Sequence, residues 1–344
     1  MSPRAVRGAL PRSVAARDMG DDDRTFQRPG KRTRPRTKDR PDYSALPLGR
    51  VITIDRGRYR CRVLDADGLA GGPIVTATKA RSLGRKAAIV GDVVRLDGEV
   101  SGSEGTLARI AEVVERTTVL RRTADDTDPY ERPLVANADQ LMIVTALADP
   151  PPRVGMIDRL LVAGYDAGLQ PVLCLTKADL SSPEHLQAAY GPLDVPIVVT
   201  EPDSDLGPVR ALLVGHVTVL VGHSGVGKST LVNRLIPGVN RTIGEVNDVT
   251  GRGRHTSTSA IALELPGGRG WVIDTPGVRS FGLSHVTVER VLRAFPDLEE
   301  LTVDCPRGCT HAADQPECAL DTAVAAGRLG SERLDSFRRM TAAR

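Results

Sequence analysis

The sequence predicts an α/β protein in which a small N-terminal β-barrel precedes a parallel-sheet domain and a helical, cysteine-containing C-terminal module. Three observations lead to this prediction. Short β-rich runs separated by turns recur over residues 46–120. From residue 138 onward, buried strand patterns alternate with amphipathic helix patterns, which indicates a parallel sheet. Three Cys and one His then cluster within residues 305–318.

Composition and charge favour a globular protein of the cytoplasm. The chain has 344 residues, of which 40% are apolar and 26% charged, an ordinary balance for globular domains. No apolar run approaches the 18 residues that a membrane helix needs, and no apolar stretch follows the N-terminal arginines as in a secretory signal. The five cysteines fit a reducing compartment better than a disulfide framework.

The first 45 residues are predicted to be a disordered basic tail, because they are rich in Arg, Asp and Pro and lack apolar periodicity. Residues 24–40 contain eight basic side chains and one acid. Such a block is either a solvated tail or an arm attracted to phosphate. The sequence leaves both interpretations open.

Residues 46–120 are predicted to form a five-stranded OB-fold barrel. Turns are expected at Asp67-Gly68, Gly71-Gly72-Pro73 and Asp97-Gly98. Tyr59 is the one aromatic residue of the segment, so stacking on bases is poorly supplied. Basic residues could still contact RNA phosphates, although a purely structural barrel remains an alternative. They are Arg56, Arg58, Arg60, Arg62, Arg81, Arg85 and Lys86.

Residues 121–285 are predicted to form an α/β nucleotide-binding domain. Its central motif follows the buried strand pattern Val217–Val221 and runs from Gly222 to Ser229, with a helix pattern after it. This is the phosphate-binding P-loop in its expected context. Lys228 is expected to reach the β- and γ-phosphates and assist catalysis, and Ser229 to bind Mg²⁺. The predicted contacts in this loop are Gly222, His223, Ser224, Gly225, Val226, Gly227, Lys228, Ser229 and Thr230.

Base selection is assigned to the turn Thr176-Lys177-Ala178-Asp179, which ends another buried strand. The Asp179 carboxylate can accept from N1–H and N2–H₂ of guanine, a donor pair that adenine lacks. The Lys177 stem could pack over the base. Guanine-nucleotide proteins usually carry Asn where this chain has Thr176, so the pocket is expected to be slightly looser.

Two later segments have the character of nucleotide switches. The Gly- and Arg-rich stretch Thr250–Thr258 is predicted to be a mobile loop in which Thr256 or Thr258 binds Mg²⁺. The strand pattern Gly270–Ile273 leads to Asp274, a candidate metal holder, and to Gly277, whose N–H can meet the γ-phosphate. Because the base-reading turn precedes the P-loop, the domain is predicted to be circularly permuted.

Residues 286–344 are predicted to form a helical zinc-binding module. Cys305, Cys309, His311 and Cys318 match a closed structural Zn²⁺ site, with one ion per chain. The alternatives are unligated cysteines or a catalytic zinc, and four filled ligand positions argue against the second.

Together these motifs resemble the ribosome-small-subunit-dependent GTPase A family (RsgA, also YjeQ or EngC) over residues 46–340. The resemblance implies a GTPase, with Mg and GTP, that acts in late maturation of the small ribosomal subunit and is stimulated by it. The ligand spacing departs from the family's. Three residues separate Cys305 from Cys309, where four are usual, and six separate His311 from Cys318, where five are usual. We expect a reshaped ligand loop.

The resemblance also makes His255 the candidate for orienting water, because Val278 stands where many GTPases carry Gln; a His contacting RNA or solvent is the alternative. The expected partners are GTP or GDP and the small subunit with its rRNA, bound by a monomer. Arg333, Arg338 and Arg339 are expected to assist this attachment. An RNA-binding module with a structural nucleotide site, or a P-loop enzyme for a small molecule, would be the competing functions.

Overall fold

The computed structural model describes residues 42–66, 68–84, 88–122, 132–239, 260–275, 283 and 286–343. The chain divides into two compact units, residues 1–42 and 43–344, and every helix and strand given below belongs to the second. The predicted tail, apart from its end, lies outside the described residues. So do Arg85, Lys86, the stretch Thr250–Thr258, Gly277 and Val278.

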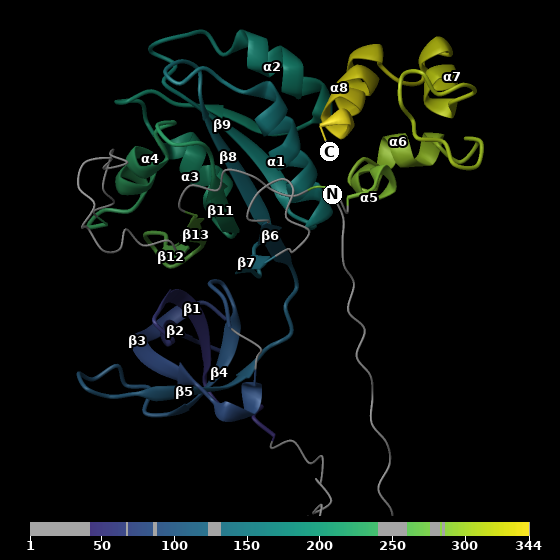
Figure 1. Ribbon diagram of the computed structural model, residues 1–344. Coiled ribbons are helices and arrows are strands. Elements are labelled where there is room, and N and C mark those ends of the chain that lie inside the picture. Colours follow the sequence, from purple (N-terminus) through teal and green to yellow (C-terminus); the bar gives the residue numbers. More distant parts are fainter. Residues whose placement is uncertain are drawn as a thin grey trace, which may run out of the picture. The chain divides into compact units, whose positions relative to one another are not determined.

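The predicted N-terminal barrel is present and closed (Figure 1). Its strand order is β1-β2-β3-β5-β4, and β4 pairs back with β1. Alternate side chains such as Val51, Cys61 and Leu96 fill its interior and are fully buried, as the period of two along a strand requires. The strands are β1 (Leu48–Asp55), β2 (Arg58–Leu64), β3 (Ala70–Lys79), β4 (Val93–Gly98) and β5 (Ala108–Val113), with a short helix η1 (Arg81–Leu83).

The turn predicted at Gly71-Gly72-Pro73 is wrong, because these residues lie inside β3. The β2–β3 register is irregular between Arg62 and Leu64, and the extra residues of β3 fall there. Glycine is needed at this irregularity, because a Cβ on Gly72 would lie only 2.7 Å from the Cβ of Val63. Turn-type residues in a strand often mark such a bulge rather than its end.

A hairpin of β6 (Val119–Arg122) and β7 (Arg132–Ala136) follows the barrel. The predicted domain boundary at residues 120 and 121 falls inside β6; the other boundaries stay predictions. Gly91, next to β4, has a φ of +90°, and a Cβ there would lie 2.1 Å from the carbonyl oxygen of Ala136. The barrel therefore approaches β7 too closely for any side chain at position 91.

The second domain is built on a six-stranded sheet of order β10-β9-β8-β11-β13-β12. All neighbouring strands are parallel except β12, which pairs antiparallel with β13 and was not predicted. The strands are β8 (Gln140–Ala146), β9 (Gln170–Thr176), β10 (Ile197–Val199), β11 (Val217–Val221), β12 (Ile261–Glu264) and β13 (Trp271–Asp274).

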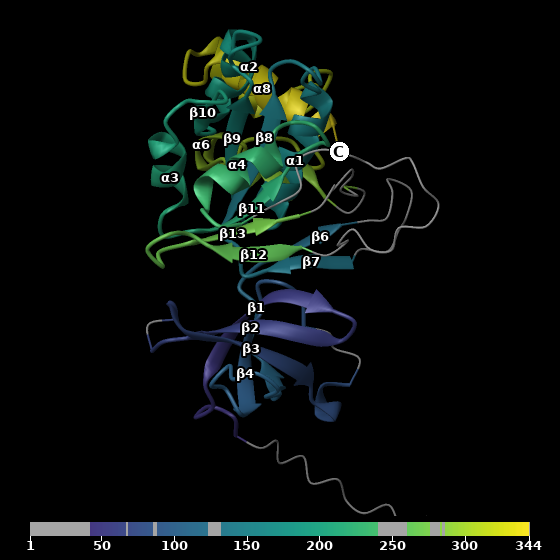
Figure 2. The same cartoon turned by 90° about the vertical axis from the view of Figure 1, so that its left-hand side faces the viewer.

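Helices cover both faces of this sheet (Figures 1 and 2). Along β8 the side chains alternate, so Leu141 and Ile143 enter one buried cluster while Met142 and Val144 enter the other. The first cluster contains α1 (Val154–Asp166) and α2 (Glu184–Tyr190), and the second contains α3 (Gly207–Leu213) and α4 (Lys228–Leu235). A short helix, η2 (Gly191–Leu193), follows α2.

The C-terminal module packs onto the α1 side of the sheet through α8. Phe337 and Met340 of α8 are fully buried in the same cluster as α1 and α2. An edge-on ring contact between Phe295 and Tyr165 of α1 joins the module to the sheet domain, and a second one, between Phe295 and Phe337, lies within the module. The helices of the module are α5 (Val288–Leu292), α6 (Pro296–Leu301), α7 (Ala319–Ala325) and α8 (Ser331–Ala342).

Three arginines that were expected to contact RNA are instead paired with other groups of the same chain. Arg333 binds Asp297 with two hydrogen bonds and also reaches Asp194, while Arg339 contacts the buried carboxylate of Asp158 at 3.3 Å. Arg338 pairs with Asp321 and donates to the backbone oxygen of His311, as described below. Pairing of this kind cannot be read from sequence, because the partners lie up to 181 residues away.

Two further contacts join the barrel to the strands β12 and β13 of the large sheet. Arg62 forms a 2.8 Å ion pair with Glu264 of β12, so this arginine too is engaged internally. The Arg50 guanidinium lies 5.5 Å from the ring centroid of Trp271 on β13. Glu264 and Trp271 are register partners in the β12–β13 ladder, as Arg50 and Arg62 are in the β1–β2 ladder.

The buried ion pair between Asp92 and Arg116 leads to a prediction about stability. The Asp92 side chain is 0% exposed and accepts hydrogen bonds from Arg116 at 2.7 and 2.8 Å. Arg116→Met would leave this carboxylate buried without its cation and should lower the free energy of unfolding by about 3 kcal/mol, measured by urea denaturation of the full chain. Arg109→Met is the matched control, because its pair with Asp97 is exposed and should matter little. Equal losses in both variants would contradict the prediction.

Candidate functional site

The predicted nucleotide motifs meet at one edge of the large sheet. The strands β8, β9, β11 and β13 are parallel and hydrogen-bonded in succession, so their carboxyl ends lie at the same edge. Thr176 ends β9, Gly222 follows β11 directly, and Asp274 ends β13. This is the edge at which open α/β sheets bind their ligands.

The P-loop needs its glycines for local reasons. Gly222 has no room for a side chain, since a Cβ would lie 2.3 Å from the backbone oxygen of Val144 on the neighbouring strand. Gly225 and Gly227 have φ values of +84° and +87°, in the left-handed region that favours glycine. Gly227 is the N-cap of α4, and Lys228, Ser229 and Thr230 form its first turn.

Lys228 is held at the end of β13. Its Nζ lies 2.8 Å from Oδ1 of Asp274 and 2.6 Å from the backbone oxygen of Thr275. The Asp274 carboxylate is 2% exposed, and the Thr275 hydroxyl donates to Leu220 of β11 at 2.7 Å. The P-loop lysine and the predicted metal-binding carboxylate are therefore direct neighbours.

The turn Thr176–Asp179, which was predicted to read the base, is fixed at both ends. Lys177 has a φ of +58°, which turns the chain away from β9, and its Nζ donates to the backbone oxygen of Asp149. The N–H of Ala178 donates to the oxygen of Thr200, beyond β10, at 3.2 Å. Asp179 is exposed at the surface of this turn, while Thr176 is buried behind it.

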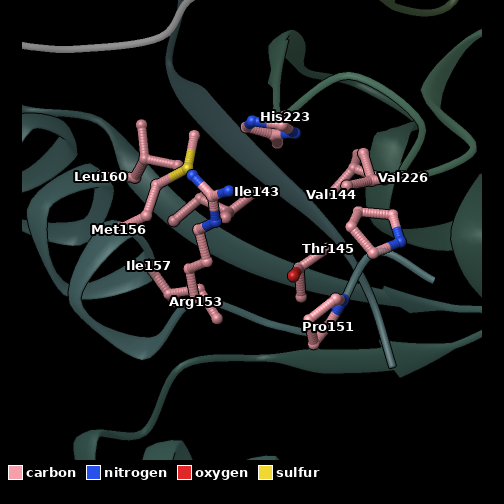
Figure 3. Close-up of a pocket in the computed structure, with 12 residues that line it drawn as sticks. Ile143, Val144, Thr145, Pro151, Arg153, Met156, Ile157, Leu160, His223 and Val226 are labelled. Carbon is pink, nitrogen blue, oxygen red and sulfur yellow. The ribbon is translucent and has the colours of Figure 1, made fainter. Parts of the chain in front are cut away.

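A pocket lies beside the P-loop on the α1 side of β8 (Figure 3). His223 and Val226 of the loop line it together with Arg153 and Met156, which lie at the start of α1. His223 Nδ1 also lies 2.9 Å from the backbone oxygen of Ser224. Val226 is at the same time buried in the cluster that contains α3 and α4. The other lining residues are Ile143, Val144, Thr145, Pro150, Pro151, Ile157, Leu160 and Gly222.

Four predicted site residues lie outside the described residues. They are His255, Thr256, Thr258 and Gly277, so their positions relative to Lys228 and Asp274 stay predictions.

The four predicted metal ligands come together in the C-terminal module. Their ligand atoms all lie within 4.8 Å of one another, and all but Cys305 are buried. His311 Nδ1 is 3.6 Å from the sulfur of Cys305, 3.4 Å from that of Cys309 and 3.7 Å from that of Cys318. His311 itself has a φ of +56°, in the left-handed region that is uncommon for residues other than glycine. This Cys₃His cluster could hold a metal ion.

Burial shifts the titration of two of the four residues. It raises the pKa of the Cys305 thiol to about 11. Burial lowers the pKa of His311, which favours the neutral imidazole that metals bind. Arg338 supports the strained ligand backbone: its Nε donates to the His311 oxygen at 2.8 Å while Asp321 holds the rest of the guanidinium at 2.8 Å.

Sequence reasoning missed the residues that support the motifs. Asp149 could have been found, because Asp149-Pro150-Pro151 follows a buried strand pattern at the edge where ligands bind. Arg338 carried no such signal, since its partner His311 lies 27 residues away in an irregular loop.

Comparisons with known proteins agree with this geometry. A sequence model of the RsgA GTPase family matches residues 113–284. The small ribosomal subunit biogenesis GTPase RsgA of Pseudomonas aeruginosa (strain LESB58) is 39% identical over 251 residues, which cover 70% of this chain and 72% of that protein. The protein of the same name from Azotobacter vinelandii is also 39% identical over 251 residues, covering 70% and 71%.

Two solved structures are similar to the chain. YjeQ from Thermotoga maritima matches with a TM-score of 0.64 at 24% identity, over 86% of this chain and 97% of that one. YloQ, described as a circularly permuted GTPase, matches with a TM-score of 0.62 at 25% identity, over 87% and 95%. The predicted fold class, a barrel followed by a permuted P-loop domain and a C-terminal module with a potential metal site, is confirmed. The chain belongs to the RsgA GTPase family.

Proposed function

We propose that the chain hydrolyses GTP during maturation of the small ribosomal subunit and that this subunit stimulates its turnover. The observation that carries the proposal is the meeting of Lys228, Asp274 and the turn 176–179 at one sheet edge, in a chain 39% identical to proteins named for that activity. The experiment that tests it is GTP hydrolysis with and without purified small subunits.

The phosphate groups would be bound by the P-loop. The side chain of Val226 is buried in the cluster that contains α3 and α4, so the backbone N–H groups of the loop would be the ones that meet phosphate oxygens. Lys228 would move from Asp274 and the Thr275 oxygen to the β- and γ-phosphates. Ser229, Asp274 and either Thr256 or Thr258 would hold Mg²⁺, which neutralises charge on the transferred phosphate. Gly277 would bind the γ-phosphate through its N–H.

The base would be read at the exposed turn beyond β9. The Asp179 carboxylate would accept from the two guanine donors, and the Lys177 stem, fixed by the Asp149 oxygen, would cover one face of the base. Because a carboxylate has no protons to donate at neutral pH, adenine would leave it unpaired.

Water activation would depend on His255, since Val278 offers no polar group. An imidazole can accept from the attacking water and position it. The subunit would supply the surroundings that bring His255 to the γ-phosphate, which accounts for stimulated turnover.

The metal would be one structural Zn²⁺ per chain. With Zn–S about 2.3 Å and Zn–N about 2.05 Å in a tetrahedral site, the nitrogen and each sulfur would lie about 3.6 Å apart. The separations of 3.4, 3.6 and 3.7 Å in the cluster support this assignment. All four positions are filled by protein ligands, so the ion would stabilise the module rather than activate water.

Attachment to rRNA would be electrostatic, by a monomer. Arg56, Arg58, Arg60 and Arg81 are exposed on the barrel and remain candidates for phosphate contacts, together with the segment 24–40. Arg62, Arg333, Arg338 and Arg339 are engaged in internal pairs and are no longer assigned to RNA. Among the described residues, no helix has the length and apolar character needed to cross a membrane.

Base selectivity should follow Asp179. GDP and GTP are expected to bind while ATP barely competes, and Asp179→Asn should shift preference toward xanthine nucleotides, whose 2-oxo group accepts from the new amide. Displacement of a fluorescent GDP analogue by GDP, ADP and XDP measures this. Effective competition by ADP in the parent protein would refute the assignment.

Metal binding should depend on Arg338 through His311. The parent is expected to contain about one zinc per chain, and Arg338→Met should weaken zinc affinity about tenfold because the ligand backbone loses its support. Metal analysis and chelator competition measure both quantities. Arg307→Met is the control, because Arg307 is exposed in the same loop. Parent protein without zinc, or equal affinity in both variants, would contradict the prediction.

Subunit stimulation should require His255 and fall with salt. His255→Ala should leave GTP affinity nearly unchanged and lower stimulated turnover about 10²-fold, as expected for one positioned catalytic group.

Binding of small subunits, followed by co-sedimentation, should weaken steeply with salt because phosphate contacts release counterions. Unstimulated turnover together with salt-insensitive pelleting would overturn the proposed partner.

A further inference from the structure

The side chain of Thr176 points at the P-loop rather than at the exposed base-reading turn. Thr176 is the last residue of β9 and is 6% exposed. Its Oγ1 lies 2.7 Å from the backbone oxygen of Val226 and 3.3 Å from that of Thr145. A Cβ built on Gly227 would lie 3.6 Å from the same Oγ1. The hydroxyl is therefore packed against the underside of the loop.

This geometry determines what the hydroxyl can do. Both oxygens near it are acceptors, and a hydroxyl has one proton to donate. The 2.7 Å separation is that of a full hydrogen bond, while 3.3 Å is long for an O–H donor. The proton is thus committed to Val226, and none is left for an acceptor on a nucleotide base.

The Val226 oxygen matters because of the peptide to which it belongs. The carbonyl of Val226 and the N–H of Gly227 lie in one planar trans peptide and point in opposite directions. With the carbonyl directed to β9, the N–H is directed away from β9. No described group accepts a hydrogen bond from that N–H. Gly227, with a φ of +87°, has the backbone freedom that would allow this peptide to rotate.

We propose that Thr176 is a positioning residue, which holds the Val226–Gly227 peptide with its N–H facing a bound nucleotide phosphate, and that it makes no contact with the base. Base selection then rests on Lys177 and Asp179 alone. If the Thr176 hydroxyl is removed, the Val226 carbonyl loses its donor, and rotation of the peptide would present an oxygen to the phosphate instead of an N–H. The inference rests on the proposed GTP-binding function and extends it.

Thr176→Val tests the proposal, because valine has nearly the shape of threonine and lacks the hydroxyl. The full-length variant should bind GDP about tenfold more weakly, the effect expected when a buried carbonyl loses its hydrogen bond and the loop loses its geometry. The same factor should apply to IDP and to 7-deaza-GDP, which alter the edge of the base and leave the diphosphate unchanged. A base contact would instead make the loss vanish for the analogue that lacks the contacted atom.

Two further variants separate positioning from stability. Thr176→Ser keeps the hydroxyl and should keep the parent affinity for GDP. Thr218→Val is the matched control: Thr218 is buried as well and donates to Gln140 Oε1 at 2.7 Å, but it lies near the start of β11, away from the loop. It should lower the melting temperature and leave GDP affinity unchanged. If Thr176→Val does not fold, Thr176→Ala removes the same hydroxyl and is read in the same way.

The outcomes are distinct. Unchanged GDP affinity in a folded hydroxyl-free variant, a loss confined to some bases, or a tenfold loss in Thr176→Ser would overturn the positioning role while leaving GTP binding intact. Failure of the parent protein to bind GDP would overturn the proposed function itself. A uniform loss for all three nucleotides, with Thr176→Ser and Thr218→Val at parent affinity, is the result that the proposal expects.

Discussion

The parallel hydrogen-bonded ladder through β9, β8, β11 and β13 is the constraint on which the rest of the structure depends. Its register sets Thr176 opposite Ala146, Val221 opposite Ile143 and Asp274 opposite Leu220. A shift of one residue would turn alternate side chains to the other face and would carry Asp274 away from Lys228. The order in which the chain visits these strands does not alter the ladder. A permuted sequence can therefore assemble the same edge.

Much of the fold could be predicted from the sequence, because its signals were local. The strand Val217–Val221 was predicted with the bounds that it has, since a β-branched apolar run precedes an unambiguous glycine motif. Irregular pairing was not predictable: Gly71–Pro73 has the composition of a turn, yet lies in β3, because only the register with β2 distinguishes a bulge from a turn. The edge strand β12 was missed because four residues carry little periodicity.

The candidate site could be predicted as a set of residues, but not as a set of contacts. The motif residues were identifiable by type and spacing, and the four metal ligands meet as expected. The partners that orient them were not identifiable, because a backbone carbonyl such as that of Val226 or Asp149 has no signature in sequence. The same limitation applied to arginine. A guanidinium that binds RNA and one that binds a distant Asp are identical in sequence, and Arg333 and Arg339 proved to be of the second kind.

The packing of α8 has a consequence for how the protein is made. Phe337 and Met340 belong to the buried cluster that contains α1, and Arg339 is the cation that faces the buried Asp158 carboxylate. These residues are synthesised nearly two hundred positions after α1. During synthesis the first elements of a domain emerge before the last, so until α8 is made α1 lacks the Arg339 cation and part of the cover of its apolar face. Core closure on this side of the sheet thus has to follow the synthesis of α8, and so comes after that of the P-loop strand.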